Sequence, residues 1–180
     1  MGSCARTEGD QVLIFTNTKR MVDILDERLK RYGIESSALH GDMAQNKRER
    51  ILNGFREGRK SILVATDVAA RGLDVDGITH VINYDLPEET EVYVHRIGRT
   101  GRMGRSGQAW SFVTSGEQGM LQKIANTWNM TIPLVDAPEL PPGTKEMIRH
   151  KEDWDELSDS FGMVTVRLSV GSGDASKLTL

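Results

Sequence analysis

The chain has 180 residues, 38% of them hydrophobic, and a formal net charge of −3 at pH 7, which suits one domain with an ordinary core, or one domain plus a fragment of another. Its single cysteine, Cys4, excludes an internal disulfide and a metal site built on thiolates, and no apolar run is long enough to span a membrane. With no charged-then-apolar leader either, we expect a soluble, cytoplasmic protein that needs no membrane, no metal ligands of its own and no oligomer.

The hydrophobic pattern predicts strands and helices that alternate along the chain. The predicted strands are short apolar runs, at Val12–Thr16, Ser36–Leu39, Ser61–Ala65, His80–Tyr84 and Ala109–Val113. The predicted helices follow them, at Thr18–Arg31, Asn46–Arg56, Val68–Arg71, Thr90–Ile97 and from Ser115 onward. This order predicts an α/β fold with a parallel sheet that helices flank on both faces.

In a parallel sheet of this kind, ligands bind at the carboxyl ends of the strands. The loops Thr16–Lys19, His40–Asp42 and Thr66–Asp67 follow the first three predicted strands. We therefore expect these three loops to be functional.

The composition changes after residue 133. Three prolines (Pro138, Pro141 and Pro142) and a run of acidic residues predict a tail or linker over residues 136–162. Val164–Val170 then alternates like a strand, and an isolated strand is not stable without partners. Residues 163–180 are therefore either the start of a truncated domain or a tail strand that packs back on the core.

Between Arg96 and Gly107 an arginine and a glycine each recur at every third residue. The repeated glycines disfavour a long helix and let the backbone approach a ligand closely. Guanidinium groups match phosphate oxygens two bonds at a time. A disordered Arg-Gly tail is the alternative, but the run lies in mid-chain between a predicted helix and a predicted strand. The run therefore predicts an ordered site for phosphates.

Taken together, the motifs resemble those of the C-terminal RecA-like domain of DEAD-box RNA helicases, over roughly residues 10–135 of the predicted domain 1–135. The chain carries VLIFTNTK like helicase motif IV, HGD followed by QxxR like two further family elements, ATDVAARGLD like motif V and YVHRIGRTGR like motif VI. The resemblance implies a RecA-like three-layer fold. It also implies that ATP and RNA are the ligands.

The resemblance assigns the ATP-contacting residues to motifs V and VI. It implies that Arg99 and Arg102 are catalytic arginine fingers, which stabilise charge on the γ-phosphate, and that Asp74 binds the ribose. Asp74 could instead be a turn aspartate. Arg71, His95 and Arg96 are expected to hold two domains together around the nucleotide, although Arg71 could instead form a salt bridge with Asp67.

The resemblance places the RNA contacts at four residues: Thr18, Gly41, Arg48 and Thr66. Hydroxyls and a glycine amide suit phosphates and 2′-hydroxyls, which position RNA without reading its sequence. Arg48 could instead pair with Glu49 or Asp42 on the surface. Phe55 shares an apolar helix face and is predicted to be core rather than a platform for base stacking.

The chain contains neither a GxxxxGK[ST] loop nor a DEAD sequence. The groups that hold ATP and Mg²⁺ are therefore expected on an N-terminal RecA-like domain of the same protein, which would be the main protein partner. We therefore expect the chain to be the C-terminal half of an ATP-dependent RNA helicase, which hydrolyses no ATP by itself. An RNA-binding or regulatory clamp without its own ATPase is the alternative, and a DNA-directed or DEAH-type relative is a third. The last residues also resemble the opening of the RRM-like domain found in one branch of these helicases.

Overall fold

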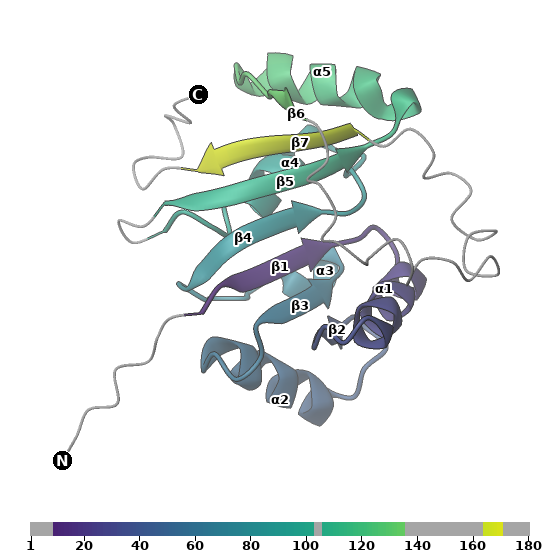
Figure 1. Cartoon of the computed structure of the whole chain (residues 1–180), viewed down its shortest axis with the longest axis vertical. Helices are drawn as coiled ribbons and strands as arrows, with labels where there is room; N and C mark the ends of the chain where they lie inside the picture. The colour runs from purple at the N-terminus through teal and green to yellow at the C-terminus, as the bar shows by residue number, and fades with distance from the viewer. Residues whose placement is uncertain (1–8, 103–105, 136–163, 171–180) are drawn as a thin grey trace.

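The computed structural model describes residues 9–102, 106–135 and 164–170, and most of them belong to one sheet with its covering helices. The sheet has the strand order β2-β3-β1-β4-β5-β7-β6, from β2 near α2 to β6 near α5 (Figure 1). The strands are β1 Gln11–Phe15, β2 Ser37–Leu39, β3 Ile62–Ala65, β4 Ile78–Asn83, β5 Gly107–Val113, β6 Leu134–Val135 and β7 Val164–Val170. The helices are α1 Lys19–Arg31, α2 Gln45–Arg56, α3 Asp67–Ala70, α4 Thr90–Ile97 and α5 Gln118–Trp128, with a 3₁₀ turn at Ser115–Glu117.

Helices cover both faces of the sheet, as predicted. Leu13 and Phe15 of β1 belong to one buried cluster, together with side chains of α2, α4 and α5. Ile14, between them in sequence, faces the other way and packs near Val22 of α1. Because successive strand residues point to opposite faces, each central strand contributes to both cores. The sequence-based prediction of a three-layer α/β fold is confirmed.

The helix boundaries follow from local chemistry. Thr18 caps α1, because its hydroxyl accepts a hydrogen bond from the Met21 N–H at 3.1 Å. The chain leaves α1 at Gly33, which has a φ of +73°, a conformation that glycine adopts without strain. Before α5, a capping box is formed by Thr114 and Glu117, one residue ahead of the predicted helix start at Ser115. The Glu117 carboxylate accepts from both the backbone N–H and the hydroxyl of Thr114, at 2.9 and 2.7 Å.

The parallel part of the sheet comprises β2, β3, β1, β4 and β5. β7 differs from the prediction of a parallel sheet, because it pairs antiparallel with β5 along Gly107–Val113 and also with β6. For Val164–Val170 this is the arrangement of a strand that packs back on the core. The predicted linker, residues 136–162, lies outside the described residues, and the division into domains stays a prediction. No helix in the described ranges has the length and apolar character needed to cross a bilayer.

Candidate functional site

The buried side chain of Arg96, on α4, lies at the centre of a polar network. Its side chain is 1% exposed and sits over the Phe15 ring, with 5.2 Å from the guanidinium carbon to the ring centroid. Its Nε and Nη2 donate to the two carboxylate oxygens of Asp67, at 2.7 and 2.6 Å. The remaining N–H groups donate to the Asn83 and Asn17 side-chain oxygens at 3.3 and 2.8 Å and to the Asp85 carbonyl at 2.7 Å.

All five N–H groups of Arg96 therefore have acceptors inside this domain. Within this chain every donor of the buried guanidinium is occupied, and the interdomain role of Arg96 stays a prediction. Both Asp67 carboxylate oxygens accept hydrogen bonds from Arg96. The alternative for Arg71, a salt bridge with Asp67, is therefore not formed in the structure. The sequence reading missed Asn17, Asn83 and Asp85. Each is a polar residue at or just beyond the carboxyl end of a strand, which was the available signal.

Asp85, which follows β4, also belongs to this network. One of its carboxylate oxygens accepts the backbone N–H of Asn17 at 2.9 Å. Burial raises the pKa of the Asp85 carboxyl above its ordinary value, and the hydrogen bond from Asn17 and the charge of Arg96 oppose that rise. The Asn17 Nδ2 also donates to the Leu86 carbonyl at 2.8 Å. The loops after β1 and β4 are thus joined by two direct contacts, to Asp85 and to Leu86, and by a third through Arg96.

Arg99 and Arg102 lie at the opposite edge of the sheet, where β4 and β5 begin. The Arg99 Nη1 donates to the Leu73 carbonyl at 3.0 Å, and the Arg102 Nε donates to the Gly98 carbonyl at 3.0 Å. Partial burial, and then the neighbouring charge of Arg102, lower the pKa of the Arg99 guanidinium. Two adjacent cations that repel each other favour a bound anion.

Asp74 accompanies these arginines. Its carboxylate lies 3.8 Å from the Arg102 Nη1, and its side chain is 85% exposed. An ion pair this exposed and this long contributes little to stability. The structure thus brings together the three residues predicted to contact ATP, with Asp74 open to solvent.

The loop that carries the arginines is held by a close backbone approach at Gly107, the first residue of β5. A Cβ atom at this position would lie 1.9 Å from the Thr100 Oγ1 and 2.7 Å from the Gly101 nitrogen. Thr100 is 2% exposed, and its hydroxyl donates to the carbonyl of Ile78, the first residue of β4, at 2.6 Å. Glycine at position 107 is therefore what lets the arginine loop reach the amino ends of the strands. Arg105, which also belongs to the Arg-Gly run, lies outside the described residues.

The residues predicted to contact RNA lie at the carboxyl edge, as the parallel sheet predicts. Thr18 follows β1, Gly41 follows β2 and Thr66 follows β3. The Thr66 hydroxyl has no hydrogen bond within the described part of the chain. Arg48 contacts neither Glu49 nor Asp42, because its Nη2 donates to the Ala69 carbonyl at 2.8 Å and fastens α2 to α3.

Charged groups surround Gly41. The Lys19 ammonium lies 2.5 Å from the Asp42 carboxylate, and this hydrogen bond lowers the pKa of Asp42. A Cβ on Gly41 would lie 3.7 Å from the Lys19 Cε, which is ordinary contact. The His40 Nε2 lies 3.0 Å from Asp23, whereas its Nδ1 is buried without a hydrogen-bond partner in the described ranges.

Two predicted interdomain residues are open to solvent. Arg71 and His95 are both exposed, and neither side chain makes a hydrogen bond or an ion pair with another described residue. Phe55 is fully buried in the main core, which confirms the core prediction for that residue. Because the side chains of Arg71 and His95 are exposed, they can contact a second domain, and their interdomain role stays a prediction.

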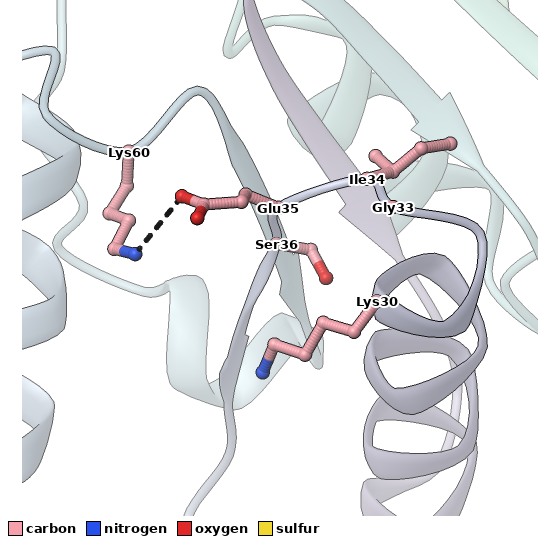
Figure 2. Close-up of a pocket in the computed structure, with 6 residues that line it drawn as sticks. All are labelled: Lys30, Gly33, Ile34, Glu35, Ser36 and Lys60. Carbon is pink, nitrogen blue, oxygen red and sulfur yellow. Dashed lines mark ion pairs between the residues drawn. The ribbon is translucent and has the colours of Figure 1, made fainter.

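A pocket of about 410 Å³ lies away from both edge clusters, between the end of α1 and the segments that lead into β2 and β3 (Figure 2). Its two cations are already neutralised. Lys30 pairs with Asp26 at 2.6 Å, and Lys60 faces Glu35 at 3.7 Å, the pair marked in Figure 2. The pocket therefore offers no excess of positive charge for a phosphate.

Comparison with known proteins agrees with this geometry. The model of the helicase conserved C-terminal domain matches residues 3–104. The DEAD-box ATP-dependent RNA helicase CshA of Bacillus cereus is 51% identical over 128 residues, which is 71% of this chain and 24% of the relative. The ATP-dependent RNA helicase DBP2 of Candida albicans is 51% identical over 141 residues, 77% of this chain and 24% of the relative. The chain thus spans about a quarter of the length of these curated relatives.

Solved structures give the same family. The DEAD-box protein SrmB of E. coli, bound to regulator of ribonuclease activity A, is 39% identical with a TM-score of 0.63, over 68% of this chain and 72% of that one. Dbp5 of S. cerevisiae, bound to RNA and ADP BeF3, is 37% identical with a TM-score of 0.64, over 82% of this chain and 36% of that one. Domain 2 of the DEAD-box helicase Mss116p, bound to an RNA duplex, is 28% identical with a TM-score of 0.69, over 87% of this chain and 64% of that one. The chain therefore belongs to the helicase C-terminal domain family, in its DEAD-box RNA helicase branch.

Proposed function

We propose that this chain is the half of an ATP-dependent RNA helicase that supplies arginine fingers and RNA backbone contacts for local duplex unwinding. The observation that carries the proposal is the pairing of Arg99 with Arg102 at one edge of the sheet. Each guanidinium uses part of its donors to fix its own position, through the Leu73 and Gly98 carbonyls. The other N–H groups make no hydrogen bond to described residues and are free for a phosphate.

The chemistry of phosphoryl transfer explains why two such arginines matter. Negative charge spreads over the γ-phosphate oxygens as the bond to the leaving group breaks, and positioned guanidiniums stabilise that charge. In the proposed enzyme, ATP and Mg²⁺ are held by an N-terminal RecA-like domain. Arg99 and Arg102 approach from across the cleft, Asp74 accepts hydrogen bonds from the ribose, and Arg71 and His95 contact the other domain.

RNA is proposed to lie along the carboxyl edge, on the loops that carry Thr18, Gly41 and Thr66, beside Arg48. Two solved relatives support this ligand, since Dbp5 was solved with RNA and ADP BeF3 and Mss116p domain 2 with an RNA duplex. The nucleotide and RNA groups lie at opposite edges of one sheet. One domain thus presents a surface to each ligand.

The test is RNA-stimulated ATPase activity of the full-length protein that contains this chain. Arg99→Ala and Arg102→Ala are each expected to lower turnover by about 10³-fold, because an arginine finger contributes about 10³–10⁵ in rate. RNA affinity should stay nearly unchanged, since neither residue lies at the carboxyl edge. Arg59→Ala is the matched control, because Arg59 is an exposed arginine whose only ion-pair partner among the described residues is Glu57.

The outcomes separate the candidate functions. Turnover unaffected by both substitutions would contradict the arginine-finger role. A wild-type protein without RNA-stimulated turnover would instead favour an RNA-binding clamp without its own ATPase. The isolated chain is expected to hydrolyse no ATP, because its sequence lacks the GxxxxGK[ST] loop. Magnesium-dependent ATPase from the pure chain would contradict that expectation.

A further inference from the structure

The guanidinium of Arg96 joins three loops that follow three neighbouring strands. Asn17 follows β1, Asp67 follows β3 and Asp85 follows β4, and these strands lie side by side in the order β3-β1-β4. The acceptors lie 79, 29 and 11 residues away from Arg96 in the sequence. A single planar group therefore fixes how far apart three distant segments lie.

Two of these loops carry residues proposed to contact RNA. Thr18 is adjacent to Asn17, and Thr66 is adjacent to Asp67. Arg96 itself cannot touch RNA in this arrangement, because it is 1% exposed and all its donors are used. We infer that Arg96 is a positioning residue, which holds the loops after β1, β3 and β4 at the spacing that RNA binding requires. This inference rests on the proposed RNA-binding function of the carboxyl edge.

The choice of arginine follows from the number and direction of the acceptors. The acceptors are two carboxylate oxygens, two amide oxygens and one backbone carbonyl, arranged around the plane of one guanidinium. Lysine has three donors on one nitrogen and cannot reach acceptors on several sides. Because the guanidinium of Arg96 is buried, losing one partner affects the others, since a buried donor without an acceptor is costly.

Asp67→Asn is the substitution that tests the inference with least change in volume. An asparagine keeps one oxygen for Arg96, but it turns an NH₂ group toward the other donor and removes the charge that compensates the guanidinium. Arg96 is then expected to shift, and its bonds to Asn17 and Asp85 weaken with it. The effect should therefore reach loops that Asp67 itself does not touch.

The first readout needs no ligand and uses backbone hydrogen exchange of the whole chain. One bonded amide reports on each loop: Asn17 to the Asp85 carboxylate, Ala70 to the Thr66 carbonyl and Tyr84 to the Phe15 carbonyl. In Asp67→Asn all three are expected to exchange about tenfold faster or more. The Met130 amide lies beyond the end of α5 and is bonded to the Ala125 carbonyl. It is the control for global unfolding, and its exchange rate should not change. Faster exchange at Ala70 alone would overturn the inference.

The second readout is affinity for a short single-stranded RNA, measured by fluorescence anisotropy. Asp26→Asn is the matched control, because Asp26 is likewise a carboxylate with both oxygens bonded within the chain, to Ser36 at 2.6 Å and to Lys30 at 2.6 Å. Asp67→Asn is expected to raise the Kd about tenfold, whereas Asp26→Asn leaves it unchanged at a similar loss of thermal stability. Equal affinities in the two variants would refute a positioning role.

The two readouts keep this inference apart from the proposed function. If the wild-type protein binds no RNA, the proposed RNA contacts fail. Hydrogen exchange at Asn17, Ala70 and Tyr84 still decides whether Arg96 sets the spacing of the loops.

Discussion

Replacing Gly107 by alanine tests the close backbone approach that holds the arginine loop. The added Cβ would lie 1.9 Å from the Thr100 Oγ1, 2.8 Å from the Thr100 Cβ and 2.7 Å from the Gly101 nitrogen. Rotating the Thr100 side chain relieves the first contact but not the others, because the Gly101 nitrogen belongs to the backbone. Thr100 is also buried and bonded to the Ile78 carbonyl at 2.6 Å, so moving it breaks that bond.

The expected cost combines two effects. Overpacking that shifts the backbone costs about 1–3 kcal/mol, and loss of the Thr100 hydrogen bond adds about 1 kcal/mol. We therefore expect Gly107→Ala to lower the free energy of unfolding by about 2–4 kcal/mol in urea denaturation followed by circular dichroism.

The control for this substitution is Gly119→Ala in α5. No atom lies within 4 Å of the Cβ that this substitution would add. Alanine in a helix is favoured over glycine by up to about 1 kcal/mol, so this variant should be as stable as the wild type or more so. A free energy of unfolding for Gly107→Ala within about 0.5 kcal/mol of the wild type would refute the reasoning.

Three further predictions follow from the contacts of single side chains. Burial raises the pKa of Tyr93 to about 12, so the stability of the fold should be full below about pH 10 and fall as the pH rises toward 12. Tyr93→Phe should reduce that fall, and at neutral pH it should lower the free energy of unfolding by about 1 kcal/mol, because the hydrogen bond between the Tyr93 and Ser111 hydroxyls is lost. If urea denaturation gave the same loss of stability at alkaline pH for Tyr93→Phe as for the wild type, the prediction would be wrong. Lys19→Met should raise the pKa of Asp42 toward its ordinary value without measurable loss of stability, as NMR titration of the carboxyl carbon would show. Arg96→Ala should lower the free energy of unfolding by about 3–5 kcal/mol, because it leaves the Asp67 charge and several buried acceptors unpaired; a cost below about 1 kcal/mol would count against the network.

The elements of the fold were largely predictable because short apolar runs and helical spacing alternate along the chain. The helix over Thr90–Ile97 was predicted with the bounds that it has in the structure, and the strand of β1 is displaced by one residue from its prediction. The position of β7 was not predictable. Its partner β5 ends about fifty residues earlier in the sequence, and pairing across such a distance depends on tertiary contacts rather than on local pattern.

The candidate site was predictable in its parts and less so in its arrangement. Motif order pointed to the arginines and to the loops after the strands, and the sheet direction placed Thr18 and Thr66 at one edge. The network around Arg96 was not predicted, because the sequence does not show which of the motif VI arginines Arg96, Arg99 and Arg102 is buried. Their surroundings differ: Arg96 points into the core, while Arg99 and Arg102 lie beyond the end of α4.

The separation of the two clusters follows from the direction of α4. A helix that connects two parallel strands returns the chain from the carboxyl edge to the amino edge, so residues after its end lie opposite the loops that precede it. The segment Thr66–Asp74 makes the same crossing, from a proposed RNA contact to a proposed ribose contact. The two segments are joined at three points, from Asp67 to Arg96, from the Leu73 carbonyl to Arg99 and from Asp74 to Arg102. The first of these contacts is bidentate and involves a buried guanidinium, and the last is exposed and 3.8 Å long. The crossing is therefore fixed firmly at the end proposed to contact RNA and weakly at the end proposed to contact the nucleotide. In the proposed enzyme, Asp74 and Arg102 can thus exchange their mutual contact for contacts with a bound nucleotide.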